Sequence, residues 1–243
     1  MPGTPNEILL VTPVWNDSSR LAVFGETLGK ALADSALPVR WMIADDGSEP
    51  EERPRLEALR ARFSEVFSRV DLHFADGHRG KGSVVREAWS LAPDADWLAF
   101  VDADGAISAE DMLTLLGRAV SSGNSVLGVR KRTATTRIVE SPLRGIFHRG
   151  FLLAAHVLLD LQCADVQCGA KVIRGDEYRR IAYRLEEDGL AFDSELLSTL
   201  KRSGAEWDEI PINWTEKKGG KVRPVRDGVR MLAALLRVRS RDW

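Results

Sequence analysis

The sequence has little of what marks a secreted, a membrane-spanning or a nucleic-acid-binding protein. Its 243 residues include two cysteines, Cys163 and Cys168, which are too few for a disulfide scaffold and lack the second pair that a zinc site needs. No apolar run reaches the roughly 18 residues that a membrane-spanning helix requires, and we expect no signal peptide. The net charge of −2 excludes the broad basic field of a nucleic-acid binder. These absences predict a cytoplasmic protein with reduced cysteines and no nucleic-acid partner.

The charge that is present is unevenly placed. Apolar residues make up 44% of the chain and charged residues 29%, which is the composition of a globular protein with a sizeable core. From Lys217 to Arg241, however, nine lysines and arginines stand against one acid, Asp227. This basic C-terminal segment suits contact with phosphates or with an anionic membrane surface, and a solvated helix face is the plainer alternative.

Strand-like and helix-like segments alternate through the first half of the chain. Continuous apolar runs predict buried strands, and capping residues such as Ser18, Ser19 and Ser108 predict helix starts between them. The predicted strands lie at residues 8–11, 39–44, 70–74, 97–101 and 125–129, and the predicted helices lie at 18–35, 51–67, from 80 onward, and at 109–120. This alternation predicts an α/β fold with a mostly parallel, doubly wound sheet flanked by helices.

The second half of the chain is less regular. Its patterns predict helices at 143–161, 176–185, 193–203 and 226–239, and a strand near 207–214. A loop containing Cys168 and Gly169 is expected between the first two of these helices. Because no repeat or low-complexity linker interrupts the chain, we expect a single domain.

Acidic residues follow three of the predicted strands. Asp17 comes shortly after the first strand, Asp45 and Asp46 end the second, and Asp102-Ala103-Asp104 follows the fourth. Because ligands bind at the carboxyl ends of the strands in open α/β sheets, these acids should line one site. Asp104 can bind Mg²⁺ or Mn²⁺ while Asp102 reaches a ribose or a metal-bound water. The alternative is that each motif is an ordinary turn or helix cap.

A glycine-rich stretch, Gly77–Gly82, precedes another predicted helix. It is neither a P-loop nor a GxGxxG motif, because the spacing of both is absent. Backbone amides at a helix start together with Lys81 still suit a phosphate or a nucleotide. A solvated turn is the alternative.

In this order, the motifs resemble those of the family 2 glycosyltransferases. Thr12–Asp17 is similar to the opening Pro-x-Tyr-Asn-Glu pattern of that family, and Asp45–Ser48, Arg79–Gly82 and Asp102–Gly105 follow with the family's spacing. Asp165–Lys171 resembles the Asp-x-Gln-Cys-Gly-Phe-Lys stretch of the subgroup that glycosylates dolichyl or other polyprenyl phosphates. Three further stretches fit that subgroup, namely Phe192–Leu197, Glu209–Trp214 and Lys221–Arg223, so the resemblance extends from about Ile8 to Arg239.

The resemblance implies a GT-A fold and an inverting transfer of a hexose, glucose or mannose, from a UDP- or GDP-sugar. A Mg²⁺ or Mn²⁺ cofactor held by Asp102 and Asp104 would neutralise the leaving diphosphate. Residues 7–130 would form a nucleotide-binding half and residues 131–243 an acceptor-binding half. The nucleotide-binding residues so implied are Pro13, Trp15, Asp17, Asp45, Asp46, Lys81 and Asp102. Arg130, Lys221 and Arg223 would serve the phosphates, and Asp165 and Gln167 the sugar or acceptor.

The chain departs from the family's pattern at four positions. Trp15 stands where tyrosine is usual and Asp17 where glutamate is usual, which keeps the chemistry but changes the reach of each side chain. Ala106 stands at the glutamine position of many mannosyl-transferring relatives, so Asp-Ala-Asp-Gly looks more like the glucosyl-transferring branch. Ala170 replaces the usual phenylalanine and would enlarge the acceptor side of the site.

The predicted helix at 143–161 bears on the acceptor. Its apolar residues recur at helical spacing, and Arg144, His148 and Arg149 lie at its N-terminal end. Such a helix could lie on a membrane surface and receive a lipid phosphate. The family resemblance favours this interpretation, and it implies peripheral contact at the inner face of the membrane and a polyprenyl phosphate acceptor. The alternative is a core helix with solvated arginines.

The need for a general base depends on the acceptor. A phosphate monoester is already anionic and needs none, whereas a hydroxyl acceptor needs a carboxylate within reach of its proton. Asp193 and Glu195 are the candidates for that second case, although either can be a plain first-turn acid of its helix.

Two other classes of protein stay open on the residues alone. A sugar-phosphate nucleotidyltransferase would use a similar scaffold, but the glycine-rich loop and basic signature that such enzymes carry after the first strand are missing at Thr12–Asp17. A non-catalytic nucleotide-sugar-binding protein is the other alternative, and the intact acids argue against it.

Overall fold

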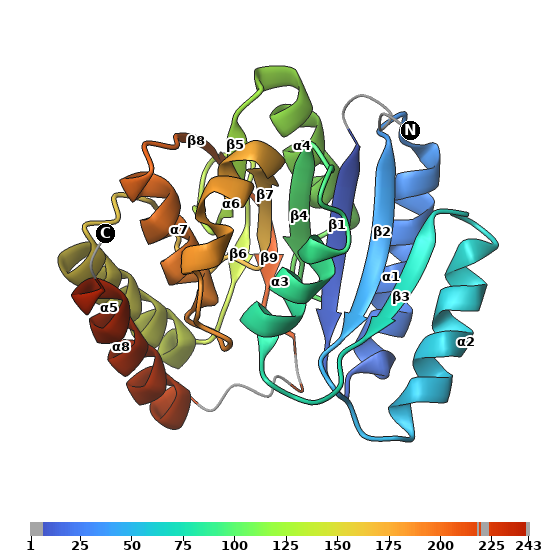
Figure 1. Ribbon diagram of the computed structural model, residues 1–243, viewed down its shortest axis with the longest axis horizontal. Helices are drawn as coiled ribbons and strands as arrows, with labels where there is room; N and C mark the ends of the chain where they lie inside the picture. Colours follow the sequence, from blue (N-terminus) through green and yellow to red (C-terminus); the bar gives the residue numbers. More distant parts are fainter. Residues whose placement is uncertain (1–6, 218, 220–223, 242–243) are drawn as a thin grey trace.

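A seven-stranded sheet lies at the centre of the computed structural model, which describes residues 7–217, 219 and 224–241 (Figure 1). The strand order is β3-β2-β1-β4-β7-β5-β8. The strands are β1 (Ile8–Val14), β2 (Val39–Asp45), β3 (Val70–Phe74), β4 (Trp97–Val101), β5 (Ser125–Val129), β7 (Ala170–Arg174) and β8 (Trp207–Pro211). A separate parallel pair is formed by β6 (Ile138–Val139) and β9 (Trp214–Thr215).

Eight α-helices of the described part flank this sheet on both faces. They are α1 (Ser18–Asp34), α2 (Glu52–Ser64), α3 (Lys81–Ser90), α4 (Ala109–Ser122), α5 (Pro142–Leu159), α6 (Gly175–Ile181), α7 (Phe192–Arg202) and α8 (Pro224–Ser240). Apolar side chains of α1, α2 and α4 pack on one face, and those of α3, α5, α6, α7 and α8 pack on the other. The predicted α/β class with a mostly parallel sheet is confirmed, because β7 alone runs antiparallel to its neighbours in the seven-stranded sheet.

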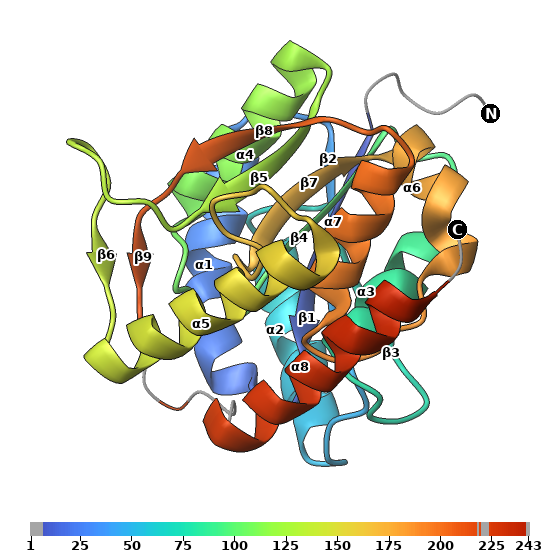
Figure 2. The same ribbon diagram turned by 90° about the vertical axis from the view of Figure 1, so that its left-hand side faces the viewer.

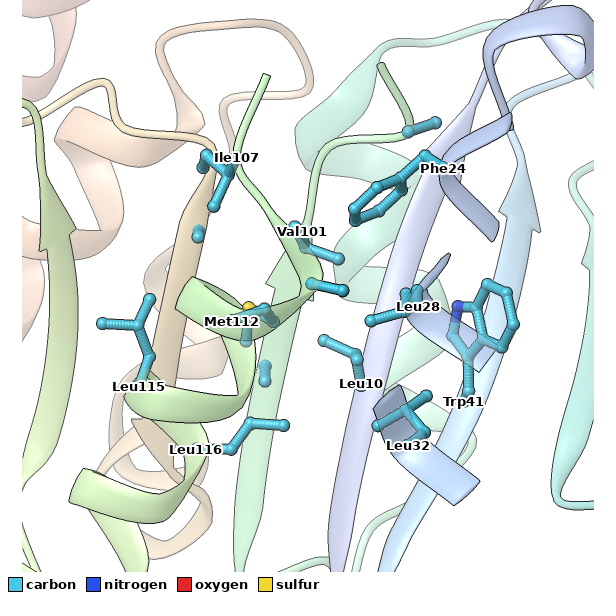
Figure 3. Packing of buried hydrophobic residues seen from close by; sticks show 14 of the residues in the cluster. Leu10, Phe24, Leu28, Leu32, Trp41, Val101, Ile107, Met112, Leu115 and Leu116 are labelled. Atoms are coloured by element: carbon cyan, nitrogen blue, oxygen red, sulfur yellow. The ribbon is translucent and has the colours of Figure 1, made fainter. Parts of the chain in front are cut away.

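The strands are continuous apolar runs because both of their sides are covered. In β1, Leu10 faces the helix layer of α1 and α4, whereas its neighbour Leu9 faces the layer of α3 and α7. Figure 3 shows the first of these layers, in which Leu28 of α1 and Met112 of α4 meet the strands. Burial on two faces removes the polar alternation that a half-exposed strand would show.

The prediction for the second half of the chain was wrong in one important place. Residues 170–174 were expected to be loop, but they form β7, which lies between β4 and β5 in the middle of the sheet. Lys171 interrupts the apolar run of this strand, yet its side chain is completely buried. The lysine is tolerated there because Asp193 lies 2.5 Å from its Nζ, and a sequence scan cannot see that partner.

The two helix starts that were assigned to serines turned out differently. Ser108 caps α4 as predicted, since its Oγ accepts a hydrogen bond of 3.0 Å from the Asp111 N–H. Ser18 does not cap α1, because Asp17 occupies that position and Ser18 is the buried first residue of the helix. Its N–H donates to Glu52 Oε2 of α2 at 3.0 Å.

The order of the strands places a switch point between β1 and β4. From β1 the chain winds outward through β2 to β3, and it then returns to β4 on the opposite side of β1. The loops that leave β1 and β4 therefore diverge at their carboxyl ends, at the lower edge of the sheet in Figure 1. In such folds a ligand binds in the crevice that this divergence opens.

Candidate active site

The carboxyl edge of the sheet brings the predicted acids together. Asp17 follows β1, Asp45 ends β2 with Asp46 after it, and the Asp102–Asp104 motif follows β4. The strands β1, β2 and β4 are neighbours and run parallel, so all three loops emerge at the same edge. Three groups of acids separated by many residues in the sequence thereby share one rim.

Asp46 holds the glycine-rich loop against the end of β2. Its Oδ1 accepts hydrogen bonds from the N–H groups of Arg79, at 3.0 Å, and Gly80, at 3.1 Å, and its Oδ2 lies 2.8 Å from His78 Nδ1. Gly47 permits this approach, because its φ is +64° and a Cβ there would lie 2.3 Å from the Gly77 carbonyl carbon. The Asp-Asp-Gly motif is therefore a turn whose carboxylate holds residues 77–80 in position.

A flat aromatic surface lies beside this turn. The rings of Trp15 and His78 stack with centroids 4.0 Å apart and planes 13° apart. Trp15 and the half-buried Pro13 come from β1 and its loop, and His78 comes from the loop after β3, so the stack joins these two loops. Asp45 braces the same corner, because it accepts a hydrogen bond from the Ser48 N–H at 3.1 Å. Stacked rings next to a carboxylate are suited to a nucleobase.

A row of alternating charges runs inward from the rim. Lys171 Nζ lies 2.5 Å from Asp193 Oδ1, and the other oxygen of Asp193 lies 3.4 Å from Lys81 Nζ. Lys81 Nζ in turn lies 2.9 Å from Asp102 Oδ1. The two carboxylates raise the pKa of Lys81 against the opposing effect of its burial, so this ammonium stays charged. Asp193, a candidate base from the sequence, therefore has a lysine on each of its oxygens.

The carboxylate oxygens of the second base candidate, Glu195, are also engaged in hydrogen bonds. Its oxygens each accept a backbone hydrogen bond of 2.9 Å, from the N–H groups of Glu186 and Glu187, and its side chain is 1% exposed. Glu195 therefore holds the loop before α7 in place.

Arg20 is a member of the rim that the sequence analysis missed. From the first turn of α1 its guanidinium binds both oxygens of Asp17, with Nε 2.8 Å from Oδ1, and its Nη1 lies 3.5 Å from Asp104 Oδ2. The spacing of three residues between Asp17 and Arg20 could have suggested the first contact. The second contact spans 84 residues and depends on the pairing of β1 with β4.

The pair Asp102 and Asp104 fits a divalent cation that arrives with a diphosphate. Mg²⁺ is commonly held by one or two carboxylates together with substrate phosphates, so a cage of three or more protein ligands is not required. Among the described residues no such larger group of acids, histidines or cysteines is found. Partial withdrawal of Asp102 from water raises its pKa, Lys81 opposes that shift, and the charge of Asp104 adds to it. A cation between the two carboxylates would relieve their repulsion.

Gly169 keeps room for the Asp102 side chain. The Asp102 N–H donates to the Gly169 carbonyl at 2.9 Å, and a Cβ at residue 169 would lie 1.9 Å from Asp102 Oδ2. The loop of the Asp165–Lys171 motif thus packs directly on the predicted metal-binding acids, which gives its glycine a steric purpose.

A second cluster lies at the other end of that loop. Asp165 is completely buried and accepts hydrogen bonds from Arg130 Nε at 2.6 Å and Nη2 at 2.9 Å. Burial opposes the ionisation of Asp165, but these hydrogen bonds and the charge of Arg130 hold its pKa below the usual range. Burial and the same arginine lower the pKa of His148, whose Nδ1 lies 3.0 Å from Arg130 Nη2. A neutral His148 therefore accepts this hydrogen bond.

The remaining predicted residues are spread around this cluster. Arg144 lies over the Trp214 ring, 4.9 Å from its centroid, and Gln167 Nε2 contacts Met231 Sδ of α8 at 3.8 Å. Arg149 is exposed on α5. Lys221 and Arg223 lie outside the described residues.

Comparison with known proteins finds similarity to glycosyltransferases. No family model matches the chain. Its relatives in sequence include the glycosyltransferase AglD of Haloferax volcanii, 27% identical over 236 residues, which cover 95% of this chain and 36% of AglD. They also include the dolichyl-phosphate beta-glucosyltransferases of Dictyostelium discoideum and Saccharomyces cerevisiae, 26% and 25% identical, each matched over at least 95% of this chain and 73% of its own length. The chain thus spans about a third of AglD and about three quarters of the other two.

Solved structures establish the fold. The glucosyl-3-phosphoglycerate synthase of Mycobacterium tuberculosis, in complex with Mn²⁺, UDP and glucosyl-3-phosphoglycerate, superposes with a TM-score of 0.69 over 97% of this chain and 80% of its own, at 15% identity. The same enzyme with Mg²⁺ and UDP gives 0.68 over 98% and 81% at 14% identity. The chain has the GT-A fold that the motifs predicted, and its homologues are glycosyltransferases, mainly dolichyl-phosphate beta-glucosyltransferases.

Proposed function

We propose that this protein is a metal-dependent glycosyltransferase that transfers glucose, with inversion, from UDP-glucose to a polyprenyl phosphate. One observation carries the proposal. The stacked rings of Trp15 and His78, a cationic Lys81 and the Asp102–Asp104 pair lie together at the switch point of a GT-A fold. The dolichyl-phosphate glucosyltransferases among the relatives support the acceptor, and the UDP complexes of the structural neighbours support the donor.

In this proposal residues 7–130 bind the nucleotide. The stack of Trp15 on His78 would receive the base, and Asp17, Asp45 and Asp46 would line the pocket around base and ribose. Asp102 and Asp104 would hold Mg²⁺ or Mn²⁺, which when bound neutralises charge on the diphosphate. Arg20 keeps Asp104 oriented and limits the repulsion between Asp17 and Asp104. Lys221 and Arg223 are proposed to add cations on the diphosphate side.

Residues 131–243 are proposed to present the acceptor. A phosphate oxygen of the acceptor would form a bond to the anomeric carbon as the bond from that carbon to the diphosphate breaks, which inverts the configuration. Because such a phosphate is already anionic, the reaction needs no general base. Asp193 would then keep Lys81 aligned with Asp102 instead of taking a proton, in agreement with its lysine partner on each oxygen. A hydroxyl acceptor with Asp193 as base is the alternative.

Arg130 and its neighbours are proposed to define the acceptor side. Arg130 is fixed by Asp165 and stacks towards Trp214, 5.3 Å from the ring centroid. His148 and Arg144 extend this cluster along α5, and Gln167 and Arg149 complete the proposed set. Among the described residues, no helix combines the length and the apolar character needed to cross a bilayer. We propose that the protein meets its lipid acceptor peripherally, at the inner face of the membrane.

Transfer measured with purified protein tests the proposal. We expect release of UDP from UDP-glucose that requires Mg²⁺ or Mn²⁺, rises with a short-chain polyprenyl phosphate and stops on chelation. Asp104→Asn should reduce this activity by about 100-fold or more, since it removes one charge from the metal site. A matched control is Asp94→Asn, at an acid in the loop before β4 at the opposite end of that strand.

Other outcomes identify the rivals. Release of pyrophosphate from UTP and a sugar phosphate would point to a nucleotidyltransferase. Tight UDP-glucose binding without turnover on any acceptor would point to a binding protein. Transfer of mannose from GDP-mannose would overturn the proposed donor. Transfer to a soluble hydroxyl acceptor alone would overturn the proposed acceptor.

A further inference from the structure

The two helices α5 and α8 carry an exposed apolar surface. Thirteen large hydrophobic residues are exposed in the described part of the chain, and eight of them lie on these two helices. On α5 they are Leu143, Ile146, Phe147, Leu153 and Val157, and on α8 they are Val229, Leu232 and Leu236. We call these eight residues the apolar face.

The apolar face follows the periodicity of both helices. On α5 the steps from Leu143 to Ile146 and from Leu153 to Val157 are three and four residues, with the exposed Gly150 between them, so the side chains form one stripe. Val229, Leu232 and Leu236 repeat the pattern on α8. The other side of each helix packs against the core, because Ala155 and Leu159 of α5 and Leu235 of α8 are buried there. Both helices are therefore apolar on two sides, and one of these sides is open.

The two stripes belong to one surface. α5 and α8 pack against each other and lie side by side across the face that Figure 2 turns towards the viewer. An exposed apolar area of this kind on a soluble protein marks a contact site, whereas single exposed hydrophobic residues do not.

The charges beside the apolar face select its partner. Within α5 and α8 there are six arginines and one acid, Asp227, which gives the two helices a formal charge of +5. Two of these arginines, Arg144 and Arg237, are ion-paired with Glu216 and Glu187 of other segments. Because the whole chain carries −2, the remaining residues carry −7. Arg149, Arg226 and Arg230 are exposed along the stripes. A second copy of this chain would bring the same positive charge to the contact, whereas an anionic lipid surface is complementary to it.

The apolar face also adjoins the proposed acceptor side. His148 of α5 contacts Arg130, Arg144 of α5 lies over Trp214, and Met231 of α8 contacts Gln167. A lipid that stays in its bilayer could therefore offer its phosphate to this side of the rim. This last step rests on the proposed function, but the surface itself does not.

We infer that the apolar face of α5 and α8 inserts into the interfacial layer of an anionic membrane and orients the active-site rim towards it. Amphipathic helices with arginines at their polar border bind such layers through apolar burial and charge together.

Vesicle sedimentation tests the inference. We expect the wild-type protein to bind vesicles of phosphatidylcholine with phosphatidylglycerol, to bind pure phosphatidylcholine more weakly, and to dissociate as salt rises. The double variants Ile146→Asp with Leu153→Asp, and Val229→Asp with Leu232→Asp, should each lower the partition coefficient by roughly tenfold or more. Val23→Asp is the matched control, because Val23 is 72% exposed but lies on α1, away from this surface. All variants should keep the wild-type melting temperature, since every changed side chain is exposed.

Three results would overturn the inference. The wild type could fail to bind anionic vesicles, the variants could bind as well as the wild type, or sedimentation velocity could show a dimer that the α5 and α8 variants dissociate. Transfer to a water-soluble short-chain acceptor is measured in parallel. If that activity is absent while vesicle binding behaves as expected, the proposed function is wrong and the inference about the apolar face is supported. If the activity is intact in the non-binding variants, both are supported.

Discussion

Replacing Gly169 by alanine should damage the proposed metal site far more than it damages the fold. Gly169 has no positive φ, so alanine is compatible with its backbone. The obstacle is the Asp102 side chain, because the new Cβ would lie 1.9 Å from Oδ2 and 2.4 Å from Cγ. To regain an ordinary contact the carboxylate must move by roughly 1 Å or more.

That displacement sets the expected size of the effect. A reacting or binding group that is misplaced by about 1 Å costs on the order of 100-fold in rate, so kcat/KM for the proposed glucose transfer should fall by about that factor. If the carboxylate rotates away, the cost in stability is that of a modestly overpacked site, about 1–3 kcal/mol. For a chain of this size each kcal/mol lowers Tm by about 2–4 °C. Steady-state kinetics and thermal unfolding of the same preparation measure both quantities.

Gly117→Ala is the control for this variant. Gly117 lies within α4, and a Cβ there would meet nothing within 4 Å. This change should leave kcat/KM unaltered and raise stability by about 0.5–1 kcal/mol, because alanine is favoured over glycine in a helix interior. If Gly169→Ala retained wild-type kcat/KM, the position of Asp102 against Gly169 would be irrelevant to catalysis and the proposed metal site would be wrong.

Further predictions concern the two buried ion pairs and a cysteine. Asp165→Ala leaves the 7% exposed Arg130 without its carboxylate and should cost about 3–5 kcal/mol in urea unfolding, most of which Arg130→Met should restore in the double variant. In the wild-type protein the pKa of Asp165 is lowered from 3.8, so the contribution of its charge to the free energy of unfolding is complete above that pH. This contribution is lost as the pH falls through the lower pKa of the folded state. A free energy of unfolding that does not change with pH in this acid range would contradict the prediction. Lys171→Met should lower kcat/KM by about tenfold and be non-additive with Asp193→Asn, and additive effects would disprove a shared role. Burial raises the pKa of Cys168 to about 12, so a thiol reagent at pH 8 should label it only after unfolding; rapid labelling of the native protein would refute its burial.

Much of the fold could be predicted because its signals are local. The apolar runs of β1, β4 and β5 are continuous and short, and a strand buried on both faces produces that pattern from its own residues. The cap at Ser108 likewise depends on an atom three residues away. Where a partner lies far along the chain, the prediction failed, as for β7 with its buried Lys171 and for Ser18 at the start of α1.

The candidate site could likewise be predicted only in part from the sequence. The acids after β1, β2 and β4 could be predicted, because the end of each strand is visible in the sequence and parallel strands share an edge. The sequence also supplied the family resemblance, since the motifs keep their order and spacing. The role of Arg20 towards Asp104 could not be predicted, because that contact exists only when β1 pairs with β4.

By itself, then, the sequence determined the class of fold and the edge that carries the acids, because these depend on residue type and periodicity. The resemblance to glycosyltransferases came from the order and spacing of its motifs. The tertiary structure alone decided which charges far apart in the sequence are paired. It placed Asp193 between two lysines, Gly169 against Asp102, and α5 beside α8, each with exposed apolar residues. Ion pairs with hydrogen-bonding geometry and steric contacts require atoms within about 4 Å of each other, and the spacing of residues along the chain does not contain those distances.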